Sequence, residues 1–231
     1  MIRTERRVIV EKNEYFTRFQ EMCIGILAQS GNCEESQAFF HNAHTVPELV
    51  SAWKRYWDGF LHEVPSLVME AFRKNYDIYR EDINLAGVFY NEVPPLSAPP
   101  SIILVGDDDA DGETPSPALV VDGRHRVYVF GARKVWTKGA CNVFVNAEKA
   151  CVRLSDACRA NVEKGKVVAM DRTVVSGKGN IVCYGSVTVK LFGGSVEDYG
   201  HLLIDAYNDS RVISFTERKI NLHDNAKIFP I

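Results

Sequence analysis

The stretch GRHRVYVFGARKVWTKGACNVFV, residues 123–145, decides the fold because its pattern recurs every eight residues. A period this short must be interpreted as a structural repeat before any motif inside it is considered. Each of three units opens on a glycine and places a valine four residues later; these pairs are Gly123 and Val127, Gly131 and Val135, and Gly139 and Val143. Looser units begin at Asp171, Gly179, Asn208 and Asp224.

Alternating side chains in each unit indicate one β-strand and one turn. Inward pairs would be Val127/Val129, Val135/Thr137 and Val143/Val145, with Tyr128, Trp136 and Phe144 outward. Two units would make a coil of roughly sixteen residues with two facing sheets, and some seven coils would stack into a rod. Residues 123–231 are therefore predicted to form a narrow parallel β-solenoid.

The pattern slips by one place after Ala147. The best inward series becomes Ala150, Val152 and Leu154, followed by Cys158, Ala160 and Val162. Because a one-residue slip would reverse the two faces of a strand, we expect a bulge or an altered turn near Ala147.

The first ninety residues have helical spacing and are predicted to form a small helical domain, residues 1–90, which gives an α+β fold class overall. Thr45-Val46-Pro47-Glu48 is the capping-box pattern that begins a helix. That helix carries Trp53 and Trp57, which we expect in its core. A further helix beginning at Pro65 should end before an extended stretch, Ile83–Tyr90.

Residues 91–122 combine a proline-rich linker with an acidic loop resembling a β-hairpin. The alternate carboxylates of Asp107, Asp109 and Asp111, followed by Gly112, match the opening of a calcium-binding loop. Ala118 stands where that loop places its bidentate glutamate. A solvated acidic loop is therefore the preferred interpretation, with calcium as a weaker alternative and no other cofactor expected.

Charge is segregated along the chain. Residues 1–122 hold 10 Lys/Arg and 20 Asp/Glu, whereas residues 123–178 hold 12 Lys/Arg and 4 Asp/Glu. Attraction between the two parts, or simple solvation, would account for this asymmetry. The alternative is a nucleic-acid or other polyanion surface that combines charge with stacking. Its candidate residues are Arg124, Arg126, Tyr128, Arg133, Lys134, Trp136 and Lys138.

The composition is that of a globular protein: 46% hydrophobic and 25% charged residues, with a net charge of −3. The longest apolar runs are far too short for a membrane span, and no signal-peptide pattern follows the first methionine. We therefore expect a cytoplasmic protein that does not bind membranes. The six cysteines include no CxxC pair, so reduced and buried thiols are expected.

The period excludes the six-residue acyltransferase repeat and the nonapeptide calcium roll. Asp224-Asn225-Ala226-Lys227-Ile228 and Gly131-Ala132-Arg133-Lys134-Val135 resemble the Asn-Ala-x-Val-x-Ala units of uncharacterised bacterial β-solenoid proteins. The helical segment from Thr45 to Trp57 also resembles the region preceding those repeats. The resemblance implies a phage or mobile-element setting and no known activity.

Three functional hypotheses remain. The first is a non-enzymatic structural or interaction protein, which binds a protein partner or itself through the end of the solenoid, where the strand at Ile228 offers an edge. The second is the polyanion binder. The third is an enzyme acting on a polysaccharide through paired carboxylates such as Asp198, Asp205 and Asp209.

Overall fold

The computed structural model describes residues 2–31, 34–107, 117–200, 203–215 and 220–229. The chain divides into two compact units, residues 1–90 and 91–231. The described residues of the first unit form four helices and one short strand: α1 (Ile2–Gln29), α2 (Glu34–His41), α3 (Val46–Glu63), α4 (Pro65–Leu85) and β1 (Val88–Tyr90).

The start of α3 confirms the predicted capping box. The Glu48 amide donates to the Thr45 hydroxyl at 3.4 Å, and the Glu48 carboxylate accepts from the Thr45 amide at 3.2 Å and the His44 amide at 2.7 Å. These amides at the helix start lack intrahelical acceptors, so the two side chains satisfy them. The hydrogen bond from His44 is the main cause that lowers the pKa of Glu48.

Aromatic side chains form the core of the helical unit, as predicted. Trp53 and Trp57 are buried, and the Trp53 ring makes edge contacts with Phe40, Phe60 and Phe72. Such edge-to-face pairs are favoured by the ring quadrupoles. Phe19 of α1 adds ring contacts with Phe72 and Tyr79, so rings from all four helices meet in the core of the helical unit.

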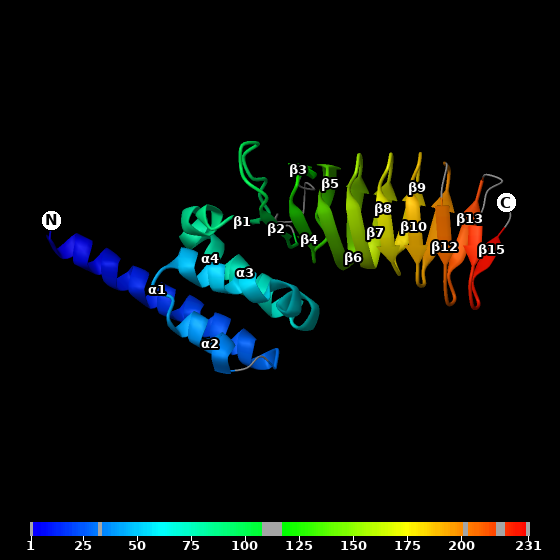
Figure 1. Cartoon of the computed structure of the whole chain (residues 1–231). Helices are drawn as coiled ribbons and strands as arrows, with labels where there is room; N and C mark the ends of the chain where they lie inside the picture. Colours follow the sequence, from blue (N-terminus) through cyan, green and yellow to red (C-terminus); the bar gives the residue numbers. More distant parts are fainter. Residues whose placement is uncertain (1, 32–33, 108–116, 201–202, 216–219, 230–231) are drawn as a thin grey trace. The chain divides into compact units, whose positions relative to one another are not determined.

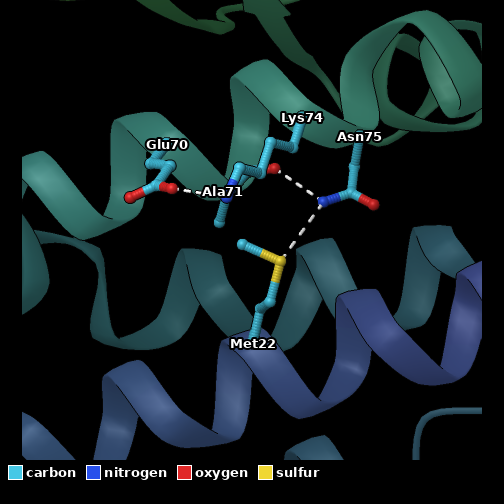
Figure 2. A network of polar contacts seen from close by, with 5 residues as sticks. All are labelled: Met22, Glu70, Ala71, Lys74 and Asn75. Carbon is cyan, nitrogen blue, oxygen red and sulfur yellow. Dashed lines mark hydrogen bonds and ion pairs between the residues drawn. The ribbon is translucent and has the colours of Figure 1, made fainter.

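One buried polar group in this unit is satisfied locally. The Asn75 amide nitrogen donates to the Ala71 carbonyl at 2.8 Å and approaches the Met22 sulfur at 3.8 Å (Figure 2). Lys74, next to Asn75, pairs with Glu70 at 2.5 Å on the exposed side of α4.

The extended stretch predicted for Ile83–Tyr90 is shorter in the structure. Helix α4 continues to Leu85, and only β1 is extended.

The second unit is the predicted parallel β-solenoid, whose stacked strands are visible in Figure 1. We call its two faces sheet 1 and sheet 2. Sheet 1 contains β2 (Ile102–Val105), β4 (Arg126–Val129), β8 (Val174–Gly177), β10 (Thr188–Leu191), β12 (Leu203–Ala206) and β14 (Ile220–Leu222). Sheet 2 contains β3 (Leu119–Gly123), β5 (Lys134–Gly139), β9 (Asn180–Cys183), β11 (Ser195–Asp198), β13 (Arg211–Ser214) and β15 (Lys227–Phe229). The long strands β6 (Asn142–Leu154) and β7 (Arg159–Ala169) continue from sheet 1 into sheet 2.

The described strands make eight coils, one more than the sequence predicted. The additional coil is the first. β2 and β3, expected as arms of a hairpin-like loop in residues 91–122, instead pair in parallel with β4 and β5. The solenoid therefore begins at Ile102 instead of residue 123. The inserted acidic segment lengthens this coil and hides its eight-residue period.

The interior follows the predicted alternation. Val127, Val135 and Val145 are fully buried, and successive coils add further valine, leucine, isoleucine and alanine side chains beneath them. The β6–β7 pairing shifts register between Val145 and Cys151, which confirms the irregularity expected near Ala147. This shift keeps Val152 and Leu154 inward after the slip.

Two kinds of residue, aspartate and glycine, form turns between coils. Asp156 and Asp171 adopt positive φ angles of 59° and 61°, and their carboxylates accept the amides of Gly139 at 2.9 Å and Asp156 at 3.1 Å on the preceding coils. Gly131 instead allows a close approach, because a Cβ atom there would lie 2.0 Å from the Gly106 carbonyl carbon. Unit starts thus select Asp or Gly for different physical reasons.

Stacked rings follow the later coils at both turns. Tyr184, Tyr199 and Phe215 stack at the turn after sheet 2, with centroids 5.3 and 4.3 Å apart. The turn after sheet 1 carries a second stack of Phe192, Tyr207 and His223, with centroids 5.4 and 4.3 Å apart. These two aromatic ladders link each coil to the next on the outside of the solenoid.

Candidate polyanion-binding face

Sheet 2 carries a flat group of cations around one exposed tryptophan. Because Val135 and Thr137 point inward, β5 turns Lys134, Trp136 and Lys138 outward. Arg153 on β6 is the register partner of Trp136. We call the following five residues the basic face: Lys134, Trp136, Lys138, Arg153 and Lys166.

The register fixes the spacing of this face. Lys134 pairs with Cys151, and Cys151 pairs with Lys166, so the two lysines lie two strands apart in one column. Neighbouring strands are about 4.8 Å apart, and alternate residues along a strand are about 6.6 Å apart. The backbone positions of the four cations are therefore roughly 8–16 Å apart on one face of sheet 2.

Trp136 is accessible and is oriented beside a cation. Its side chain is 45% exposed, and the Arg153 guanidinium carbon lies 5.8 Å from its ring centroid. The Arg153 guanidinium also approaches the Met170 sulfur at 3.5 Å. The arrangement offers both positive charge and a ring surface to a ligand.

Within the described part of the chain, no carboxylate forms an ion pair with Lys134, Lys138, Arg153 or Lys166. Lysines at the turn between the sheets, by contrast, form ion pairs. The Lys164 Nζ atom lies 3.5 Å from a carboxylate oxygen of Glu148, and the Lys178 Nζ atom lies 3.9 Å from one of Glu163. The charge of the basic face is thus left for solvent ions or a ligand, whereas charge at the turn is partly neutralised.

The structure divides the seven residues proposed from the sequence. Lys134, Trp136 and Lys138 lie together on sheet 2, but Arg126 lies exposed on sheet 1 and Arg124 lies at the turn before it. Tyr128 is only 8% exposed, so its ring offers almost no stacking surface. The half-buried Arg133 donates to the Asn91 carbonyl at 2.8 Å, which ties its guanidinium to the protein.

Sequence reasoning missed Arg153 and Lys166. Arg153 lies between the inward residues Val152 and Leu154, and Lys166 directly precedes the inward residue Val167. The alternation of side chains along a strand therefore predicts that both cations point outward. Their place beside Trp136 and Lys134 depends on the strand register, which the irregularity after Val145 shifts. The sequence therefore indicates that Arg153 and Lys166 point outward, but it does not indicate that they lie beside Trp136 and Lys134.

The acidic loop is described only at its beginning. The Asp107 carboxylate accepts a hydrogen bond from the Ala132 amide at 2.9 Å. The backbone carbonyl of Asp107 accepts one from the Asn91 side-chain amide at 3.1 Å. Asp107 therefore holds a turn of the solenoid. Asp109 and Asp111 lie outside the described residues. Among the residues that are described, no three His, Cys, Asp or Glu side chains gather closely enough to hold a metal.

The carboxylates considered for polysaccharide chemistry point in different directions. Asp198 is buried and accepts from the Gly200 amide at 2.9 Å and the Ser214 hydroxyl at 3.1 Å. Asp205 accepts from the Asn221 side chain at 2.7 Å on sheet 1, and Asp209 is exposed at the following turn. The three carboxylates do not converge on one place.

Burial shifts the pKa values of two side chains in the solenoid towards their neutral forms. Burial raises the pKa of the Cys183 thiol to about 12, which keeps that thiol protonated at neutral pH. Burial also lowers the pKa of His125, whose Nδ1 accepts the Ser101 amide at 3.2 Å.

Comparison of the chain with protein-family models, with curated proteins and with solved structures finds no match. No helix in the described residues combines the length and the apolar character that crossing a membrane requires.

Proposed function

We propose that this protein is a non-enzymatic interaction protein whose solenoid binds a polyanion on the basic face of sheet 2. The supporting observation is the set of four exposed cations around Trp136 on sheet 2, with no described carboxylate paired to them. Phosphate or sulfate groups would replace the counterions that such a face collects. The exposed ring favours single-stranded nucleic acid, because unpaired bases have faces available for stacking.

The proposal is tested by fluorescence anisotropy of a labelled single-stranded oligonucleotide at low salt. The test variant Lys134→Glu/Arg153→Glu reverses two charges on sheet 2. The control Arg126→Glu/Arg159→Glu reverses two charges on sheet 1, where these residues are exposed in one column. We expect binding to weaken by about tenfold or more in the sheet 2 variant and to change by less than about threefold in the control.

An equal loss in the two variants would show that net charge alone drives binding and would contradict a defined face. Absence of binding by the unmodified protein at low salt would contradict the proposal altogether. Circular dichroism of each variant verifies that the exposed substitutions leave the solenoid folded.

We also propose that the outer edges of β14 and β15 associate with the same edges of a second copy. Leu222 and Ile228 are 41% and 43% exposed, whereas Ala206 and Val212, their partners on the preceding coil, are fully buried. Each of these two strands pairs on one side only among the described strands. A two-fold axis would pair two such edges and cover the apolar side chains.

Sedimentation across a concentration series tests this second proposal. The full chain should form dimers that Ile228→Lys disrupts, because a charge would be placed in the covered surface. A strictly monomeric species at high protein concentration would contradict it.

A further inference from the structure

Cys141 and Cys158 occupy equivalent places on neighbouring coils. Each immediately precedes a sheet 1 strand segment, and the residues that follow them, Asn142 and Arg159, are register partners. The Arg159 amide donates to the Cys141 carbonyl at 2.9 Å. Neighbouring strands lie about 4.8 Å apart, which is within the range of about 4.4–6.8 Å between Cα atoms that a disulfide requires.

The two side chains also share one environment. Both are fully buried, and the two thiols are close enough to shift each other's pKa. The Cys141 thiol additionally approaches the Lys138 carbonyl at 3.4 Å. Equivalent positions of a parallel solenoid point the same way, so one thiol lies directly above the other.

The other described cysteines have different surroundings. Cys23 accepts the indole N–H of Trp53 at 2.7 Å within the helical unit. Cys151 is partly exposed on sheet 2, where its register partners are Lys134 and Lys166. Cys183 is buried between Ala169 and Asp198. Cys141 and Cys158 are therefore the described thiols that are neighbours on adjacent strands.

We propose that Cys141 and Cys158 form an oxidisable dithiol, which a peroxide converts into a disulfide that joins two neighbouring coils. One thiol attacks the peroxide, the O–O bond breaks, and a sulfenic acid and one water form. The second thiol then attacks the sulfenic sulfur, the S–S bond forms, and a second water leaves. The two thiols are oxidised by two electrons, and the peroxide is reduced by the same two.

The neighbouring Cys158 thiol and burial both raise the pKa of Cys141, so this thiol keeps its proton. The neighbouring Cys141 thiol lowers the pKa of Cys158, and a lower pKa makes a thiol more reactive towards an oxidant. Because both side chains are buried, only a small oxidant such as hydrogen peroxide can reach them through local opening.

The disulfide would connect the turn beside Lys138 to the next coil and close a loop between positions 141 and 158. Loop closure of this length is expected to raise the midpoint of thermal unfolding by roughly 6–12 °C. The proposal is independent of polyanion binding.

The test treats the reduced full chain with hydrogen peroxide under native conditions, blocks remaining thiols with iodoacetamide, and maps tryptic peptides by mass spectrometry. Cleavage at Lys138, Lys149, Arg153 and Arg159 places Cys141, Cys151 and Cys158 in three different peptides. We expect a linked pair containing Cys141 and Cys158, lighter than the sum of its peptides by two hydrogen atoms. Cys151→Ser should retain this product, and Cys141→Ser should abolish it.

Recovery of Cys141 and Cys158 as free thiols while Cys151 is oxidised would overturn the proposal. A mapped bond between other cysteines would overturn it as well. The measurement on the unmodified chain decides the outcome even if Cys141→Ser fails to fold.

Discussion

Asp156 and Asp171 show what a single residue contributes to a solenoid turn. Each adopts a left-handed backbone and accepts an amide of the preceding coil through its carboxylate. Asparagine and aspartate tolerate this conformation better than other residues with a Cβ atom. A turn position with Asp therefore couples two coils, which glycine at the same place does not do.

Replacing Asp171 by alanine should lower the free energy of unfolding by about 1–3 kcal/mol, because the hydrogen bond to the Asp156 amide is lost and alanine is strained at φ 61°. Asp171→Gly should lower the free energy of unfolding by less than Asp171→Ala does. Glycine also loses the hydrogen bond, but it adopts a positive φ angle without strain. Urea denaturation measures both variants. Asp209→Ala, an exposed position, is the control and should change the value by less than about 0.5 kcal/mol; equal losses for all three variants would contradict this role.

Trp136 provides the most direct residue test of base stacking. Trp136→Ala should weaken single-stranded oligonucleotide binding by about 1–3 kcal/mol, the range for loss of one stacked base. Binding of heparin, which has charge but no bases, should change little. Anisotropy with both ligands distinguishes the two contributions, and parallel losses would argue against stacking.

His125 should make stability depend on pH. Its pKa is lowered by burial, so the folded state binds a proton less readily than the unfolded state, whose histidine titrates near 6.5. The contribution is present in full above about pH 6.5 and decreases as the pH falls toward the lower folded pKa. Urea unfolding at pH 7, 6 and 5 should show a smaller decrease for His125→Gln than for the unmodified chain. Identical decreases would refute the assignment.

At the scale of elements, the aromatic ladders strengthen the later coils. Tyr199 lies between Tyr184 and Phe215 and stacks on both, with interplanar angles of 15° and 19°. Its hydroxyl also donates to Glu197 at 3.2 Å. The ladder joins three successive sheet 2 strands outside the core.

Tyr199→Ala should therefore cost about 1–3 kcal/mol of unfolding free energy, from the loss of two ring contacts. Tyr199→Phe retains the rings and removes only the hydroxyl, so it should cost under about 1 kcal/mol. Thermal and urea unfolding provide the measurement. Similar values for the two variants would show that stacking contributes little.

The strands could largely be predicted from the sequence because alternation has a direct physical cause. Val127 and Val135 recur at positions that only an inward orientation can satisfy, and the shift after Val145 follows from the change in the apolar series. The first coil could not be recognised in this way. Its two strands, β2 and β3, are separated by an insertion that breaks the period, and their parallel partners are distant in sequence.

The candidate face was predicted only in part. Lys134, Trp136 and Lys138 alternate on one strand, so their common orientation follows from the sequence. The contribution of Arg153 depends on the register between strands, and the burial of Tyr128 depends on tertiary packing. Neither property is encoded in the local spacing of the residues.

At the scale of the whole molecule, the repeat converts a one-dimensional pattern into surfaces with different chemistry. Sheet 2 presents cations on β5, β6 and β7, whereas the turns that follow its later strands carry the exposed rings Tyr184, Tyr199 and Phe215. Residues 123–178 hold 12 Lys/Arg against 4 Asp/Glu, whereas residues 179–231 are nearly balanced, with 5 Lys/Arg and 6 Asp/Glu. The basic face is thus a regional property of the early coils.

The salt dependence of oligonucleotide binding tests the central claim most directly. For a face that neutralises up to four phosphates of a single strand, the logarithm of the binding constant should fall with the logarithm of the salt concentration with a slope of about −3. Lys134→Ala/Lys166→Ala should reduce the magnitude of that slope by about half, and Arg126→Ala/Arg159→Ala should leave it unchanged. A slope unaffected by the sheet 2 substitutions, or no binding at low salt, would contradict the account.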